Sequence, residues 1–86
     1  MRIDKFLKVS RIIKRRTVAN EACDTGHISV GGKPVKASYD VKVGDIVTVA
    51  FGQRTLTFEV LDLKEHVLKD AAGELYRVIS QDKTPS

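Results

Sequence analysis

Residues 2–30 read RIDKFLKVSRIIKRRTVANEACDTGHISV, and within this stretch the spacing of apolar side chains changes from helical to alternating. At the start of the stretch, Ile3, Phe6, Leu7 and Ser10 recur at intervals of three and four residues. Such spacing puts these side chains on one face of a helix. Asp4 is expected to cap this helix, because its carboxylate can accept free amide protons of the first turn. The pattern therefore predicts a first short helix over residues 5–10.

A second short helix is predicted between Thr17, a candidate amino-terminal cap, and Gly26. One face of it carries the small or apolar side chains Val18, Ala19, Ala22 and Cys23. Small side chains on that face would allow a close approach to the first helix. Gly26 is expected to end the helix, because glycine readily adopts the left-handed conformation that commonly follows the last helical turn.

From residue 28 onward the pattern is typical of β-strands. Turn signals occur at Gly31-Gly32, Gly44-Asp45 and Gly52-Gln53. The expected strands are residues 28–30, 33–36, 46–51, 55–60 and 75–79, with a loop around residues 70–73 and a polar tail over residues 81–86. Two short helices followed by strands predict an α+β fold, in which the helices pack on a small, mainly antiparallel sheet.

Size and composition predict one small domain without a deep active site. The 86 residues can bury only a modest core. Residues 1–5 lack the apolar stretch of a signal peptide, and the longest mainly apolar run, residues 46–51, is far shorter than the ~20 residues of a membrane-spanning helix. Cys23 is the only cysteine, so no disulfide can form within the chain. A reduced, cytoplasmic compartment is therefore expected.

The positive charge is concentrated in the amino-terminal part of the chain. Residues 1–36 contain nine Lys and Arg against three Asp and Glu, a net charge of +6, whereas residues 37–86 contain six against eight, a net charge of −2. One basic face on an otherwise balanced domain favours a polyanionic partner. Charge alone does not distinguish nucleic acid from an anionic membrane or an acidic protein.

Phosphate recognition is the chemistry that this cluster favours. Arginine offers a rigid two-pronged donor for phosphate, and lysine a mobile point charge. Thr17 would open a helix directly after Arg16, so free backbone amides would lie beside the basic side chains. A solvated surface charge is the better interpretation of any single lysine, but not of seven bases within 16 residues. The candidate RNA-binding residues are Arg2, Lys5, Lys8, Arg11, Lys14, Arg15, Arg16, Thr17, His27, Lys33 and Lys36.

Other chemistry has little support in the sequence. Cys23, His27 and His66 lack the spacing of a structural zinc site, so neither a metal nor another cofactor is expected. No nucleophile-elbow or phosphate-loop motif is present, and no enzymatic activity is expected. Three of the five aromatic side chains lie in apolar alternation typical of a core. We therefore expect recognition of RNA shape and backbone rather than of bases.

Several short motifs together resemble the S4-type RNA-binding domain, also called the alpha-L motif. They are Arg2-Ile3-Asp4-Lys5-Phe6-Leu7, Arg16-Thr17-x-Ala19, Gly26-His27-Ile28-Ser29-Val30-Gly31-Gly32, Ser38 and Gly44-Asp45. The match follows the order and spacing of the family over residues 1–50, although Gly31 stands where Asn is frequent. The resemblance implies two helices packed on a small sheet, with structured RNA bound by the helical face.

The same resemblance implies roles for individual residues. Arg2, Lys5, Arg16 and the bases between them would contact phosphates, whereas Asp4 would position Arg2 or cap the helix. Gly26, Gly31 and Gly32 would be architectural and would let the loop approach the helices closely. The structural residues of the motif are Asp4, Gly26, Gly32, Gly44 and Asp45. Residues 1–50 would form the RNA-binding motif, residues 51–80 a β-rich extension of the same domain, and residues 81–86 a flexible tail.

Among stand-alone members, the chain is similar to the RqcP family of bacterial ribosome-quality-control factors. This resemblance implies the following partners: the large ribosomal subunit, ribosomal RNA (rRNA), peptidyl-tRNA and an RqcH-type tailing factor. It implies help with adding a carboxy-terminal alanine tail without mRNA. No membrane partner is implied, and a monomer is expected.

Three other interpretations stay open. A sister family of small heat-shock proteins that bind dissociated large subunits implies a recycling role instead. Similar domains are also appended to pseudouridine synthases and tyrosyl-tRNA synthetases, although 86 residues leave no room for those catalytic domains. A protein-interaction module would use the acidic carboxy-terminal half, and its binding would persist at high salt, unlike phosphate-driven binding.

Overall fold

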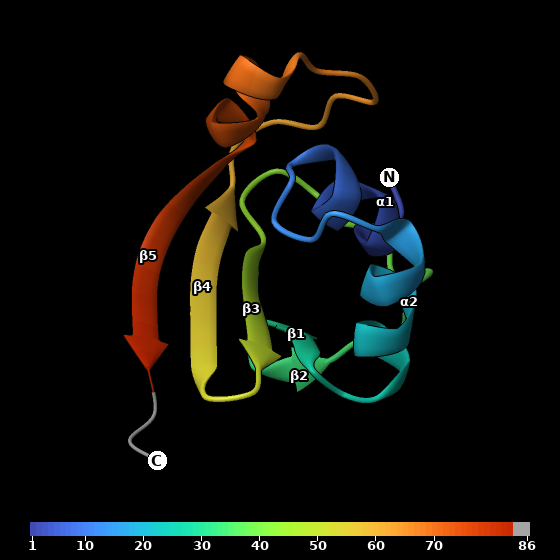
Figure 1. Ribbon diagram of the computed structural model, residues 1–86, viewed down its shortest axis with the longest axis vertical. Helices are drawn as coiled ribbons and strands as arrows, with labels where there is room; N and C mark the ends of the chain where they lie inside the picture. The colour runs from blue at the N-terminus through green and yellow to red at the C-terminus, as the bar shows by residue number, and fades with distance from the viewer. Residues whose placement is uncertain (84–86) are drawn as a thin grey trace.

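The computed structural model describes residues 1–83, which form two helices packed against one five-stranded sheet (Figure 1). In chain order the elements are α1 (Ile3–Val9), α2 (Arg16–Asp24), β1 (Ile28–Val30), β2 (Lys33–Pro34), β3 (Ile46–Phe51), β4 (Arg54–Val60), the 3-10 helix η1 (Lys69–Leu75) and β5 (Tyr76–Lys83). Every strand pair is antiparallel, in the order β2-β1-β3-β4-β5. The predicted α+β class, with two helices ahead of an antiparallel sheet, is confirmed.

Both helices begin earlier than the sequence predicted. Arg2 and Arg15 are the extended residues that precede α1 and α2, so Asp4 and Thr17 lie within the first helical turns. The prediction that these two residues cap the helices is therefore wrong. At α1 the physical reason is a tertiary contact, because the amide of Ile3 donates to the carbonyl of Tyr39 at 2.8 Å. Backbone from a distant segment thus satisfies a donor that a side-chain cap would otherwise take.

The core lies between the helices and the sheet. α1 buries Ile3, Phe6 and Leu7 of the predicted stripe, which share one core cluster with Val47, Phe58 and Val60 of the sheet. Asp4 is also buried in α1, and Ser10, the fourth residue of the stripe, is buried directly after the helix. The rings of Phe6 and Phe58 stack with centroids 6.1 Å apart. α2 buries its small residues Ala19, Ala22 and Cys23 as predicted, but Val18 is 40% exposed, so its assignment to the buried face is wrong.

Glycine conformations set the hairpin between β1 and β2. Gly31 and Gly32 have φ values of 59° and 85°, a pair of positive angles that suits the twist of a two-residue hairpin. Gly26 and Gly44 also have positive φ, 81° and 95°. A Cβ atom built on any of these four residues meets no atom within 4 Å. The expectation that Gly26, Gly31 and Gly32 permit a close approach to the helices is therefore wrong, and the positive φ of each position explains why glycine is favoured there.

The carboxy-terminal third differs most from the sequence prediction. Residues 69–75 form a 3-10 helix instead of a loop, because Ala72 and Leu75 turn inward and are 3% and 1% exposed. β5 continues to Lys83 along β4, with Gln81 opposite Leu56. The predicted tail over residues 81–86 is therefore wrong for residues 81–83, which belong to a strand. The strand predicted over residues 33–36 is only Lys33–Pro34. Residues 84–86 of the predicted tail lie outside the described residues.

The helices of residues 1–83 are short. None of them is long and apolar enough to span a lipid bilayer.

Candidate nucleic-acid interface

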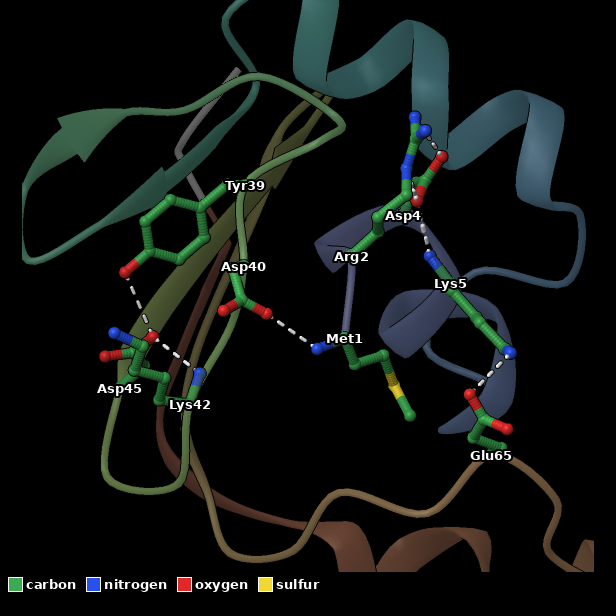
Figure 2. A network of polar contacts seen from close by, with 9 residues as sticks. All are labelled: Met1, Arg2, Asp4, Lys5, Tyr39, Asp40, Lys42, Asp45 and Glu65. Carbon is green, nitrogen blue, oxygen red and sulfur yellow. Dashed lines mark hydrogen bonds and ion pairs between the residues drawn. The ribbon is translucent and has the colours of Figure 1, made fainter.

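A buried carboxylate joins the two amino-terminal helices. The side chain of Asp4 is 2% exposed, yet each of its oxygens faces both Arg2 and Arg16. The Nε atoms of Arg2 and Arg16 lie 3.3 and 3.4 Å from Oδ1 and Oδ2. The amide of Lys5 donates to Oδ1 at 2.8 Å, and the side chain of Asn20 donates to Oδ2 at 3.3 Å. Figure 2 shows Arg2 folded over Asp4 in this arrangement.

Opposing effects act on the charge of Asp4. Burial alone would raise the pKa of this carboxyl group, because an ion is poorly solvated away from water. The hydrogen bonds from Asn20, Arg16 and the Lys5 amide, with the charge of Arg16, outweigh burial and hold the pKa below its ordinary value. Asp4 is therefore a stable anion that fixes two arginines.

A hollow opens over this cluster, lined by Arg2, Asp4, Arg16, Thr17, Asn20 and Glu21. The arginine side chains at its rim are half exposed, 50% for Arg2 and 47% for Arg16. A guanidinium group carries five N–H donors, and Asp4 uses only two from each arginine. The remaining donors can reach an anion from solvent. The geometry therefore provides two fixed, outward-facing arginine forks side by side.

A second basic hollow lies between the end of α1 and the loop after β4. The residues that line it are Lys8, Val9, Arg11, Lys14, Glu65, His66 and Val67. Arg11 has a φ of 62°, the left-handed backbone region that is unusual for a residue with a side chain. Lys5 stands beside this region but is held by Glu65, with Nζ 3.2 Å from Oε1 (Figure 2). The loop therefore places one acid among the predicted phosphate contacts.

The remaining predicted RNA contacts lie apart from these two hollows. Arg15 precedes α2 and is exposed, and Lys33 and Lys36 are exposed in and after β2. His27 is exposed before β1, where its Nδ1 lies 2.7 Å from the Thr25 hydroxyl and its ring stacks on Phe51. Six of the eleven candidates thus line the two hollows: Arg2, Arg16 and Thr17 line the first, and Lys8, Arg11 and Lys14 line the second.

Asp45, predicted to be structural, organises the turn before β3. Its Oδ2 accepts the amide proton of Lys42 at 2.9 Å and the hydroxyl proton of Tyr39 at 3.1 Å. Burial and this contact with Asp45 raise the pKa of the Tyr39 hydroxyl. Nearby, the amino group of Met1 lies 2.7 Å from Oδ1 of Asp40 (Figure 2). These contacts fix the segment that supports the start of α1.

Sequence reasoning missed Asn20 and Glu65. Asn20 follows Arg16 by four residues, a helical interval that places both side chains on one face and could have indicated their shared partner. Glu65 lies 60 residues from Lys5, so only the tertiary fold brings the two together. No cluster of three or more His, Cys, Asp or Glu within residues 1–83 is arranged to hold a metal ion.

Comparison of the sequence with known proteins places this chain in a family. The S4 domain model matches residues 1–47. Over 96% of both chains, the sequence is 52% identical to the RQC P-site tRNA stabilizing factor of Bacillus subtilis. It is 49% identical to the protein of the same name in Streptococcus pneumoniae, over 96% of this chain and 94% of the relative.

Solved structures extend the likeness to the whole fold. Heat Shock Protein 15 of Vibrio cholerae, solved as a trimer, superposes with a TM-score of 0.86 at 26% identity, covering 93% of this chain and 82% of that one. The solution structure of the hypothetical protein HP1423 gives a TM-score of 0.79 at 27% identity, covering 95% of this chain and all of that one. Both similarities extend beyond the residues that the S4 domain model matches.

Proposed function

Because this chain belongs to the S4 domain family, an RNA-binding family, we propose that it binds RNA on the large ribosomal subunit during ribosome quality control. The full-length similarity to RQC P-site tRNA stabilizing factors supports this role, since it covers 96% of the chain at 52% identity. In the proposed state the subunit still carries peptidyl-tRNA, and the protein contacts both rRNA and tRNA. It assists an RqcH-type factor in alanine tailing and acts in the cytoplasm.

The observation that carries the proposal is the pair of arginines fixed by Asp4. Arginine forks match phosphate oxygens in geometry as well as in charge. Holding both side chains in advance lowers the conformational entropy lost when an RNA backbone docks. The outward donors of Arg2 and Arg16 therefore serve as a phosphate clamp at the junction of α1 and α2.

The second basic hollow extends the contact surface. Lys8, Arg11 and Lys14 add three cations at the end of α1 and in the loop after it, and we propose that they meet a neighbouring stretch of the RNA backbone. Lys33, Lys36, Arg15 and His27 are proposed to make peripheral contacts, because each is exposed outside the two hollows. Residues 1–50 would thus carry the RNA-binding surface, with residues 51–80 as its structural extension.

We propose a binding role without catalysis and a monomeric protein. The relatives that align over nearly their whole length are named as stabilizing factors, which supports binding rather than a reaction. The alternative of a role within a pseudouridine synthase has less support, since the relatives that match most of the chain are named as stabilizing factors.

Sedimentation of a tagged copy through a sucrose gradient tests the proposal. At low salt the protein is expected to co-migrate with large subunits that carry peptidyl-tRNA, and raised salt should release it, because phosphate contacts weaken steeply with salt. Arg16→Ala should strongly reduce this co-migration. Migration only at the top of the gradient at both salt concentrations would contradict ribosome binding.

A recycling role like that of the heat-shock family is the second candidate. The TM-score of 0.86 with Heat Shock Protein 15 favours it, although the 26% identity is half that shared with the Bacillus subtilis relative. Both roles predict binding to large subunits. They differ in cells that lack the protein: the quality-control role predicts a loss of alanine-tailed peptides, and the recycling role predicts intact tailing.

A further inference from the structure

The face of the sheet that packs on the helices continues past the end of their cover. Along β3, Val47 and Val49 are 0% and 4% exposed, whereas Phe51, the next residue on the same face, is 40% exposed. Along β4 the same change occurs between the buried Phe58 and the exposed Arg54. β5 is the edge strand beside β4, and Figure 1 shows it at the side of the sheet away from α2. One end of an apolar sheet face is thus open to solvent.

This open end is hollowed. The cavity has a volume of about 590 Å³, within the usual range of small-ligand sites. Seven residues line it: four apolar side chains, two neutral polar ones and one arginine. Val49, Leu56 and Phe51 are neighbours across β3 and β4, and Arg54 lies directly opposite Phe51 in the register. Gln81 of β5 pairs with Leu56 at the far side.

We propose that this hollow binds one unpaired nucleobase of the RNA, with its ring on Phe51. Phe51 is 40% exposed and lines the hollow, and stacking on an aromatic ring accepts any base. Arg54 supplies a cation for the attached phosphate, while Gln81, paired with Leu56, offers a hydrogen-bonding group at the base edge. The inference rests on the proposed RNA-binding function and adds a ligand class, a flipped-out nucleotide, that the phosphate clamp does not need.

Charge distinguishes a nucleotide from other occupants. The described residues that line this hollow include one arginine and no acid. By contrast, Glu65 lines the hollow of Lys8 and Arg11, and Asp4 lines the clamp. An apolar floor with a single positive group at its rim complements a planar base joined to an anionic backbone, as in proteins that bind unpaired RNA.

Consecutive residues of the chain line this hollow and the second basic hollow of the proposed RNA surface. Ile12 lines it, and the preceding residue, Arg11, lines the second basic hollow. Consecutive Cα atoms lie about 3.8 Å apart, so the two sites adjoin at this loop. His27 stacks on Phe51 with an interplanar angle of 14°, which brings a further candidate contact to the same ring. A strand that leaves Arg11 and Lys14 can therefore deliver a base to Phe51.

Two RNA stem-loops that differ only by one unpaired purine test the inference. Fluorescence anisotropy of the full chain should give tighter binding to the bulged RNA, by about five-fold or more for one stacked base. Phe51→Ala should bring this ratio close to one, and Phe51→Tyr should keep it. Arg16→Ala should weaken binding to both RNAs and leave the ratio unchanged. Leu68→Ala is the matched control, because Leu68 is an exposed apolar residue outside the hollow.

The outcomes separate the two proposals. Wild-type protein that binds both RNAs equally would overturn the base site and leave RNA binding intact, whereas binding to neither would overturn the proposed function as well. Phe51→Leu keeps the apolar volume, so it replaces Phe51→Ala if circular dichroism shows that the alanine variant unfolds. Self-association that Phe51→Ala abolishes would mean that a second copy covers the face, which also overturns the base site.

Discussion

The Nε atom of Arg16 lies 3.4 Å from Oδ2 of Asp4, a carboxylate buried one helix earlier in the chain. Because the same carboxylate also holds Arg2, the positions of the two arginines depend on one another. A basic surface of this kind is more than a sum of charges. We propose that its contribution to RNA binding depends on the positions in which the buried Asp4 holds the two arginines, and variants of these residues can measure this dependence.

Replacing Arg16 with alanine should weaken association with large subunits by about ten-fold or more, because a charged hydrogen-bonding group is lost. The fold should persist, since the Arg16 side chain is 47% exposed and its partner Asp4 keeps Arg2 and Asn20. Co-sedimentation and a thermal melt measure the two effects. Arg77→Ala is the control, because that arginine is paired with Glu59 on the far strands. Equal losses for both variants would contradict the clamp.

Replacing Asp4 with asparagine separates positioning from charge. The substitution adds one unit of positive charge, so attraction between net charges alone predicts tighter RNA binding. Loss of the anion that holds Arg2 and Arg16 predicts weaker binding, and we expect the weaker binding. Asp70→Asn makes the same charge change at an exposed acid outside both hollows and should not weaken binding. Fluorescence anisotropy titrations with RNA at one salt concentration compare the three proteins. Tighter RNA binding by Asp4→Asn than by wild type would show that Asp4 does not act by positioning the two arginines.

The stability of the fold should depend on pH through Asp4. Burial would raise the pKa of this group, but its hydrogen bonds and Arg16 lower it below 3.8. A carboxyl group with a lowered pKa in the folded state stabilises that state fully above the unfolded value. This stabilisation is lost as the pH falls below about 4 through the folded-state pKa.

Urea titrations between pH 7 and pH 2 measure this loss. The difference in free energy of unfolding between wild type and Asp4→Asn should stay constant from pH 7 to pH 5 and shrink below pH 4. A difference that is the same at every pH would show that the charge of Asp4 does not stabilise the fold.

Cys23 should resist alkylation in the folded protein. Burial first, and then the charges of Asp4 and Asp24, raise the pKa of its thiol to about 11, so little thiolate exists at pH 8. Iodoacetamide should therefore react slowly with native protein and rapidly after unfolding in guanidinium. A Ser80→Cys variant provides an exposed thiol on β5 as the control for reagent activity. Equal rates for Cys23 in native and unfolded protein would contradict its burial.

The two hairpin glycines should respond differently to substitution. Gly31→Asn should change stability little, because asparagine tolerates a positive φ such as 59° and a Cβ there meets no neighbour. Gly32→Val should cost about 1–3 kcal/mol, since a β-branched residue is strained at a φ of 85°. Chemical denaturation measures both. A larger loss for Gly31→Asn than for Gly32→Val would contradict this account of the turn.

Local patterns predicted most of the fold because they depend on periods of two and three to four residues. The stripe of Ile3, Phe6 and Leu7 and the strand over residues 46–51 are present as expected. The helix starts were wrong, since the amide of Ile3 is satisfied by Tyr39 rather than by a nearby side chain. The 3-10 helix was missed because it buries only two apolar side chains, Ala72 and Leu75, and two residues are too few to show a helical spacing in the sequence.

By itself the sequence determined where positive charge collects, which residues alternate into strands and which glycines end helices or make turns. Each of these properties depends on the residue and its near neighbours in the chain. Only the tertiary structure decided that Asp4 holds Arg2 and Arg16, that Glu65 takes Lys5, and that Phe51 emerges from the core. The physical reason is that ion pairing and burial depend on distance in space, and packing α1 and α2 on the sheet sets those distances.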